Sequence, residues 1–70
     1  MAEIRAEMVA NVWKVLVSEG DQVDGGDTLV ILESMKMEIP VLAESPGIVT
    51  KLHVAEGDVV QEDELIAEIG

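Results

Sequence analysis

The segment with the clearest chemical potential is a lone lysine between two methionines at the centre of the chain. Met35-Lys36-Met37 follows Glu33 and Ser34. An unhindered lysine amine that has lost its proton can attack an activated carboxyl group. The two flexible, polarizable methionines can either pack on the end of the fold or present a docking surface to a partner protein. An isolated turn lysine is usually a solvated charge, so the position of Lys36 in the fold decides between these uses.

Other candidates for chemistry are weak. His53 is the single histidine, has no partner evident in the sequence, and is expected on the solvent face of a strand. Asp21, Asp24 and Asp27 superficially suggest calcium, but they lack the alternating ligands and terminal glutamate of an EF-hand loop. With no Ser, His and Asp constellation and no paired-carboxylate pocket in view, we expect no catalytic residues, no metal site and no intrinsic enzyme activity.

Size and charge restrict the function further. The chain has 70 residues, of which 15 are acidic and 4 basic, for a net charge of −11. This charge opposes binding to nucleic acids and anionic membranes, and it favours a monomer. No apolar run approaches the roughly 18 residues of a membrane span. Because Met1-Ala2-Glu3 lacks the features of a signal sequence, we expect a cytoplasmic protein with one domain over residues 1–70.

The chain contains an internal repeat. Residues 6–23 align with residues 43–60 at an offset of 37, with nine of eighteen pairs identical. Beyond Val23 an offset of 36 pairs Asp27 with Asp63 and Leu29 with Leu65. A unit of roughly 30 residues cannot bury its own apolar face, so the two copies should share one core about a pseudo-twofold axis.

The composition of each copy favours strands. Twenty-three residues are Val, Ile or Leu, and no helical apolar period persists. Pro40 predicts an edge strand or a bulge. The fold class is therefore all-β, a flattened barrel or sandwich of two four-stranded antiparallel sheets with pseudo-twofold symmetry, a barrel-sandwich hybrid. The predicted strands cover residues 12–17, 28–33, 38–44, 48–54 and 64–69.

The segment 33–38 lies outside this repeat. It has no counterpart in the other half, where the pseudo-symmetric position holds the chain termini, and it lacks the Gly, Asn or Asp of a tight turn. Lys14 and Lys51 occupy equivalent strand positions and are expected to be held against the sheets. Lys36 is therefore predicted to be the lysine that is both exposed and placed at a hairpin tip.

The chain has Glu33-Ser34-Met35-Lys36-Met37 between its copies, Gly20 and Gly57 in paired Glu-Gly-Asp turns, and Ser45-Pro46-Gly47 at the start of the second copy. With these features it resembles, over essentially its whole length, the biotinyl domain, the biotin carboxyl carrier branch of the biotin/lipoyl attachment family. The short length, with Met1 at its start, looks like that of the small free-standing attachment proteins. Lipoyl domains usually carry Asp-Lys-Ala at the tip, and this sequence departs from that pattern. In this resemblance Glu33-Ser34-Met35-Lys36-Met37 corresponds to the attachment motif.

The resemblance implies that a biotin protein ligase joins biotin to Lys36 as an amide. It also implies that the carrier then shuttles a carboxyl group between biotin carboxylase and carboxyltransferase sites. Glu33, Ser34, Met35 and Met37 would be recognised by the ligase and the partner enzymes, and Gly20, Gly47 and Gly57 would form structural turns. Two alternatives stay open: a lipoyl carrier of a 2-oxo acid dehydrogenase or glycine cleavage system, and an unmodified interaction module.

Overall fold

The structure, a computed structural model, describes residues 2–70, which form eight strands and no helix. The expectation that rested on Met1 therefore lies partly outside the described residues. Within those residues no helix is long and apolar enough to cross a membrane. The strands are β1 (Ala2–Arg5), β2 (Ala10–Val15), β3 (Gln22–Val23), β4 (Thr28–Ser34), β5 (Met37–Leu42), β6 (Gly47–Leu52), β7 (Val59–Val60) and β8 (Leu65–Ile69).

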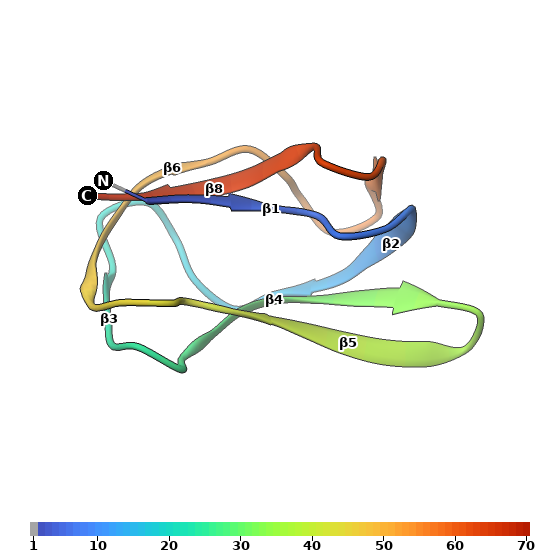
Figure 1. The fold of residues 1–70 in the computed structure, drawn as a ribbon, viewed down its shortest axis with the longest axis horizontal. Helices are drawn as coiled ribbons and strands as arrows, with labels where there is room; N and C mark the ends of the chain where they lie inside the picture. Colours follow the sequence, from blue (N-terminus) through green and yellow to red (C-terminus); the bar gives the residue numbers. More distant parts are fainter. Residues whose placement is uncertain (1) are drawn as a thin grey trace.

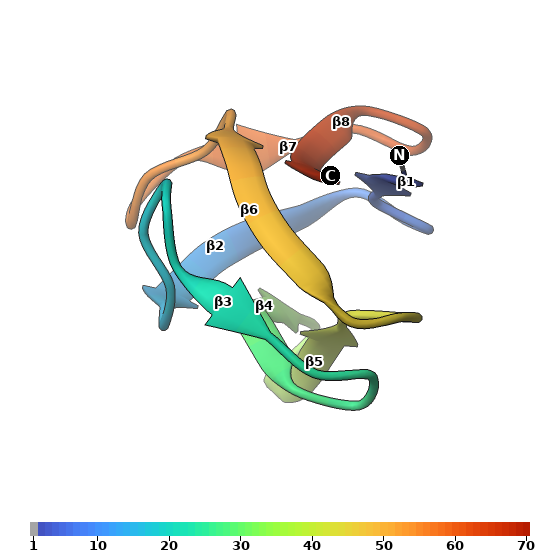
Figure 2. The ribbon, with the colours of Figure 1, turned by 90° about the vertical axis from the view of Figure 1, so that its left-hand side faces the viewer.

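The strands form two four-stranded sheets in which every pairing is antiparallel. One sheet has the order β1-β8-β6-β3 and the other β5-β4-β2-β7. In Figure 1 strands β1, β6 and β8 lie above, and the β4–β5 hairpin runs below them toward the end opposite the termini. Figure 2 views the molecule from the terminal end, with β6 crossing in front of β2. The predicted fold class is confirmed, and β5, which contains Pro40, is an edge strand as the proline indicated.

The core is aliphatic and lies between the two sheets. Strands β4 and β8 occupy inner positions of the two sheets and have the same burial pattern from their first residue. A fully buried aliphatic side chain contributes about 1.5–3 kcal/mol relative to an exposed one. The buried side chains of the core therefore dominate the folding stability. The largest fully buried side chains are Leu29, Leu32, Ile66, Val12, Val30, Val49 and Val60.

The two copies are related by an offset of 37 throughout, and the predicted change to 36 after Val23 is wrong. Ala43 donates its N–H to Asp27 O at 2.8 Å, and Ala6 donates to Glu64 O at 2.9 Å. Gly26 and Asp63 likewise have φ values of 93° and 69° at equivalent turn positions. The identities of Asp27 with Asp63 and of Leu29 with Leu65 suggested that the second copy lacks one residue. The backbone hydrogen bonds show instead which residues of the two copies are equivalent. Asp tolerates the left-handed conformation that Gly26 adopts.

A bulge occurs at the same place in both copies. The register shifts between Val12 and Lys14 in β2, and between Val49 and Lys51 in β6. A bulge inserts one residue, so alternation is interrupted and the residues beyond it switch faces. Lys14 and Lys51 are consequently exposed on strands, which corrects the expectation that they are held against the sheets. Trp13 is 42% exposed, with Lys14 Nζ 5.5 Å from its ring centroid.

The two Glu-Gly-Asp turns connect the copies across the pseudo-twofold axis. Gly20 and Gly57 have φ values of 93° and 94°, a region that favours glycine. In each turn the glutamate accepts a hydrogen bond from a strand of the other copy. Leu52 N–H donates to Glu19 Oε2 at 3.0 Å, and Val15 N–H donates to Glu56 Oε2 at 3.2 Å.

Gly47 differs from the turn residue that was expected. It is the first residue of β6 and pairs with Val23. A Cβ at this position would lie 2.7 Å from both Gly70 O and Ile69 Cγ2. Glycine is therefore required here by the close approach of the C-terminal strand.

Strand boundaries differ from the predictions at several ends. β2 and β6 begin and end earlier than expected. Their starts, Ala10 and Gly47, pair with Val60 and Val23, and their last paired residues are Val15 and Leu52. β1 was not predicted, yet it pairs with β8 over Ala2 to Arg5 as the counterpart of β5. The two-residue strands β3 and β7 are too short for a period to appear in the sequence. Pairing partners set these boundaries.

Candidate functional site

The central lysine lies at the tip of the β4–β5 hairpin. Ser34 pairs with Met37, which leaves Met35 and Lys36 as a two-residue loop. Their φ values are 52° and 65°, the positive pair that a type I′ turn requires. Figure 1 shows this hairpin projecting at the end of the molecule opposite the N- and C-termini. The tip is therefore clear of the sheet that holds the termini.

The turn has an unfavourable composition for its conformation. Type I′ turns prefer Asn-Gly because both central residues need positive φ. A left-handed conformation costs an ordinary L-residue about 1–2 kcal/mol, and here both positions are occupied by ordinary residues. Strained residues persist where the surrounding structure holds them, and they cluster at functional sites. The ladder of β4 with β5 holds this turn, and the strain points to a use for these side chains.

The side chains at the tip are open to solvent. Met35 is 90% exposed and Met37 is 59% exposed, so neither packs on the barrel end as a core residue would. Lys36 is exposed as well, and within residues 2–70 it enters no ion pair. A primary amine thus extends from a fixed backbone, flanked by two flexible thioethers. That arrangement suits covalent modification by another protein.

The base of the hairpin carries the remaining motif residues. Glu33 and Ser34 are half-buried near the end of β4. Glu33 lies directly opposite Glu38 in the ladder, and like charges that face each other across strands are unfavourable. Glu33 also pairs with Asn11 on β2. The structure thus brings the five motif residues together within one hairpin and adds an acidic pair beneath the tip.

Two residues near the hairpin were missed by sequence reasoning. Because Asn11 pairs with Glu33, the residues that precede β2 lead toward the hairpin end of the sheet. Met8 and Val9 in this link are 39% and 54% exposed. The repeat alignment could have pointed to Met8, because the equivalent residue of the second copy is Ser45 and the two copies differ there.

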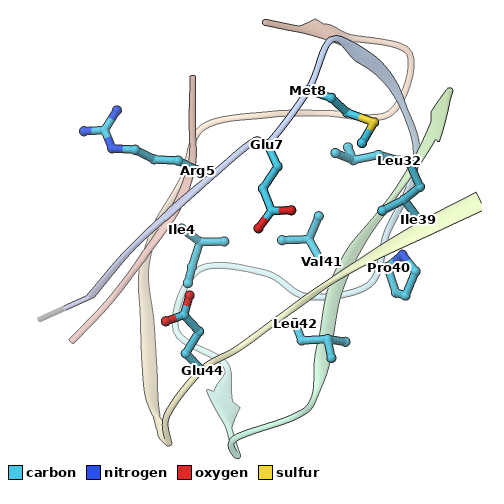
Figure 3. A pocket seen from close by; sticks show the side chains of 10 residues that line it. All are labelled: Ile4, Arg5, Glu7, Met8, Leu32, Ile39, Pro40, Val41, Leu42 and Glu44. Atoms are coloured by element: carbon cyan, nitrogen blue, oxygen red, sulfur yellow. The ribbon is translucent and has the colours of Figure 1, made fainter. Parts of the chain in front are cut away.

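A groove opens beside the hairpin between β5 and the link from β1 to β2. Its cavity volume is about 290 Å³. Figure 3 shows Met8, Leu32 and Ile39 grouped on one side, with Ile4 and Glu44 farther along and the Glu7 carboxylate directed into the space between them. Seven of the ten lining residues are apolar, and the charged ones are Arg5, Glu7 and Glu44. Such a groove can hold a small, largely apolar group.

The other candidate residues lie outside the hairpin. His53 was expected to lack a partner, but its Nε2 lies 2.8 Å from Glu68 Oε2. The expectation was wrong because β6 and β8 are neighbours in the sheet, although their residues are distant in sequence. Asp21 accepts a hydrogen bond from Ser18 N–H at 2.9 Å, and Asp27 accepts one from Asp24 N–H at 2.8 Å. The two aspartate carboxylates therefore stabilise the backbone of their turns.

The chain is similar in sequence and in fold to proteins that are already known. A family model described as "Biotin-requiring enzyme" matches residues 2–69. The biotinylated protein TB7.3 homolog of Mycobacterium leprae is 64% identical over 70 residues and covers 99% of each chain. The urea carboxylase of Kluyveromyces lactis superposes with a TM-score of 0.91 at 35% identity, over 99% of this chain and 6% of that one. The lipoyl domain of the Azotobacter vinelandii 2-oxoglutarate dehydrogenase complex superposes with a TM-score of 0.86 at 25% identity, over 100% and 96% of the two chains.

Proposed function

Because this chain belongs to the biotin/lipoyl attachment family, whose model matches residues 2–69, we propose that it is a biotin carrier modified on Lys36. The observation that carries the proposal is the strained two-residue turn, which holds the lysine at positive φ between two exposed methionines. The biotinylated relative, similar over the whole length, supports biotin as the cofactor. Residues 1–70 would then constitute a single attachment domain that acts in the cytoplasm.

The residues at the tip fit a covalently attached acyl group. The exposed Lys36 amine can enter the active site of a biotin protein ligase, lose a proton and attack the carboxyl carbon of biotinyl-adenylate. The new C–N bond replaces the C–O bond to the nucleotide, and AMP leaves. The exposed thioethers of Met35 and Met37 offer polarizable surface to the ligase. Glu33 and Ser34 would contribute to this recognition from the base of the hairpin.

The carrier role follows from rigidity behind a flexible arm. Bound biotin supplies the chemistry that carries a carboxyl group. The β4–β5 ladder fixes the Lys36 backbone relative to the barrel, so the flexible side chain presents the carried group to the biotin carboxylase and carboxyltransferase sites of partner enzymes. The urea carboxylase similarity supports carboxylases as the class of partner. The chain itself would perform no turnover and would act as a substrate and a carrier.

Mass spectrometry of protein from its native cell tests this proposal. We expect a biotin-sized increment on the intact protein, localised to Lys36 by peptide mapping. The matched control is a Lys14→Arg, Lys51→Arg double variant, which should retain the full increment because those lysines lie on strands. An unmodified Lys36 in cells with an active ligase would overturn the carrier role and favour an interaction module.

A lipoyl carrier is the second candidate, and the fold supports it. The lipoyl domain from Azotobacter vinelandii covers this whole chain in the superposition. Met35 and Met37 argue against it, since the resemblance associates Asp-Lys-Ala with lipoylation. The same mass measurement separates the two, because a lipoyl-sized increment on Lys36 would move the protein to the 2-oxo acid dehydrogenase or glycine cleavage systems.

A further inference from the structure

We propose that the groove beside the hairpin is a resting site for the bicyclic ring of the biotin carried on Lys36. This inference rests on the proposed function and adds a second position for the cofactor. The groove and the attachment turn share strands β4 and β5, since Leu32 and Ile39 line the groove and pair with each other in the hairpin. The ring could therefore fold back onto the domain that carries it.

The arm is long enough to reach the groove. Ile39 is three residues from Lys36, a span of roughly 10 Å along a strand. The lysine side chain together with the valeryl chain of biotin extends on the order of 12 Å, at about 1.5 Å per C–C bond before foreshortening. The ring can thus reach the part of the groove formed by Leu32, Ile39 and Met8, but it cannot extend to the far end near Glu44.

The groove suits the ring in both size and polarity. Ligand pockets of drug-sized molecules span about 300–1,000 Å³, so the cavity of about 290 Å³ accepts a small ring and excludes a folded partner segment. The thioether edge of the ring would lie against Met8 and Ile39. The ureido N–H groups need acceptors, and the Glu7 carboxylate is directed into the groove (Figure 3). Within residues 2–70 the Glu7 side chain makes no ion pair that would compete.

The tether makes weak binding sufficient. A group linked through a short flexible arm has an effective concentration on the order of millimolar. A groove that binds free biotin only at millimolar concentration would therefore be occupied about half the time by the attached ring. The second copy of the repeat offers no equivalent contact, because Ser45 replaces Met8 there. The resting site would thus be specific to the half of the molecule that carries the lysine.

Methyl NMR of methionine tests this directly. The chain has four methionines, so protein labelled with ¹³C at the methionine methyl groups gives a simple spectrum. Full-length protein is compared in three states: unmodified, with acetyl-lysine at position 36, and biotinylated, each confirmed by mass. We expect the Met8 methyl resonance to shift in the biotinylated state and to stay in place in the acetylated state. An unshifted Met8 in fully biotinylated protein would overturn the resting site.

A variant pair gives an independent readout. Avidin captures only the free ring, so occupancy of about one half slows capture roughly twofold. Met8→Ser removes the rim of the groove and should restore the faster capture rate. Leu16→Ser removes another exposed apolar side chain, outside the groove, and should leave the slow rate unchanged. Equal capture rates in wild type and M8S would contradict the inference. Failure of the carrier proposal remains distinguishable, since it appears as missing biotin on Lys36 before either experiment begins.

Discussion

The side chain of Glu56 accepts a hydrogen bond from the backbone N–H of Val15 across the pseudo-twofold axis, at 3.2 Å. Glu19 accepts the equivalent bond from Leu52 at 3.0 Å. Each glutamate belongs to a Glu-Gly-Asp turn of one copy and binds a backbone N–H group that follows the bulge in a strand of the other copy. The repeated turn therefore joins the halves, and neither copy would retain this contact alone.

Removal of either glutamate should lower the free energy of unfolding. A hydrogen bond to a charged acceptor is worth about 1.5–3 kcal/mol, and solvent exposure of both side chains reduces this to about 1 kcal/mol. Glu19→Ala and Glu56→Ala should each produce that loss in urea unfolding, and the double variant should show their sum. Glu62→Ala, an exposed glutamate without a side-chain hydrogen bond within residues 2–70, is the control and should change little.

Glycine at the attachment position should stabilise the fold while abolishing modification. Lys36 has a φ of 65°, which glycine adopts without steric penalty. Relief of the left-handed strain, reduced by the greater entropy of an unfolded glycine, predicts a gain of about 0.5–1 kcal/mol for Lys36→Gly. Lys36→Arg should leave stability nearly unchanged and also remove the biotin increment. Biotin retained in either variant would contradict the assignment of the attachment site.

Asparagine at the first turn position separates recognition from turn geometry. Met35 has a φ of 52°, and asparagine is preferred at this position of a type I′ turn. Met35→Asn should raise the unfolding midpoint in urea by an amount equivalent to about 0.5 kcal/mol. If Met35 is recognised by the ligase, the same variant should be biotinylated more slowly despite its greater stability. An unchanged rate in a time course followed by mass would remove Met35 from the recognition surface.

Substitution of a turn glycine should lower stability because of the positive φ and not because of a steric clash. Gly57 has a φ of 94°, and an added Cβ would meet no atom within 4 Å. Gly57→Ala should therefore destabilise by about 1 kcal/mol through backbone strain alone. Gly57→Asn should cost less, because asparagine tolerates positive φ better than alanine does. Thermal unfolding of the two variants gives the comparison, and equal losses would point to a steric cause.

Alanine at Gly47 should instead act through a collision. Its Cβ would lie 2.7 Å from Gly70 O and from Ile69 Cγ2. Forcing an extra methyl group into packed structure costs about 1–3 kcal/mol. The hydrogen bonds that Gly70 exchanges with Ile48 should weaken, so amide exchange at Ile48 should accelerate in G47A. Protection at Ile48 equal to that of wild type would show that the strand can shift to accept the methyl group.

Much of the fold followed from the repeat and from residue types. The duplicated unit, the excess of β-branched residues and Pro40 predicted two antiparallel sheets with an edge strand, and the structure has this architecture. The offset of 36 was wrong because matching letters at Asp27 and Asp63 hid the equivalence of Gly26 with Asp63. A sequence alignment compares side chains, whereas register is set by backbone hydrogen bonds that either residue can make.

The sequence by itself placed Lys36 at the centre of the one segment outside the repeat, between two methionines, and that position made it the candidate for modification. The tertiary structure decided that both turn residues adopt positive φ, that the methionines are exposed, and that Met8 lies beside the hairpin. It also decided that His53 meets Glu68. Composition and period report local preference, but strain, exposure and long-range contacts exist only after the strands have paired.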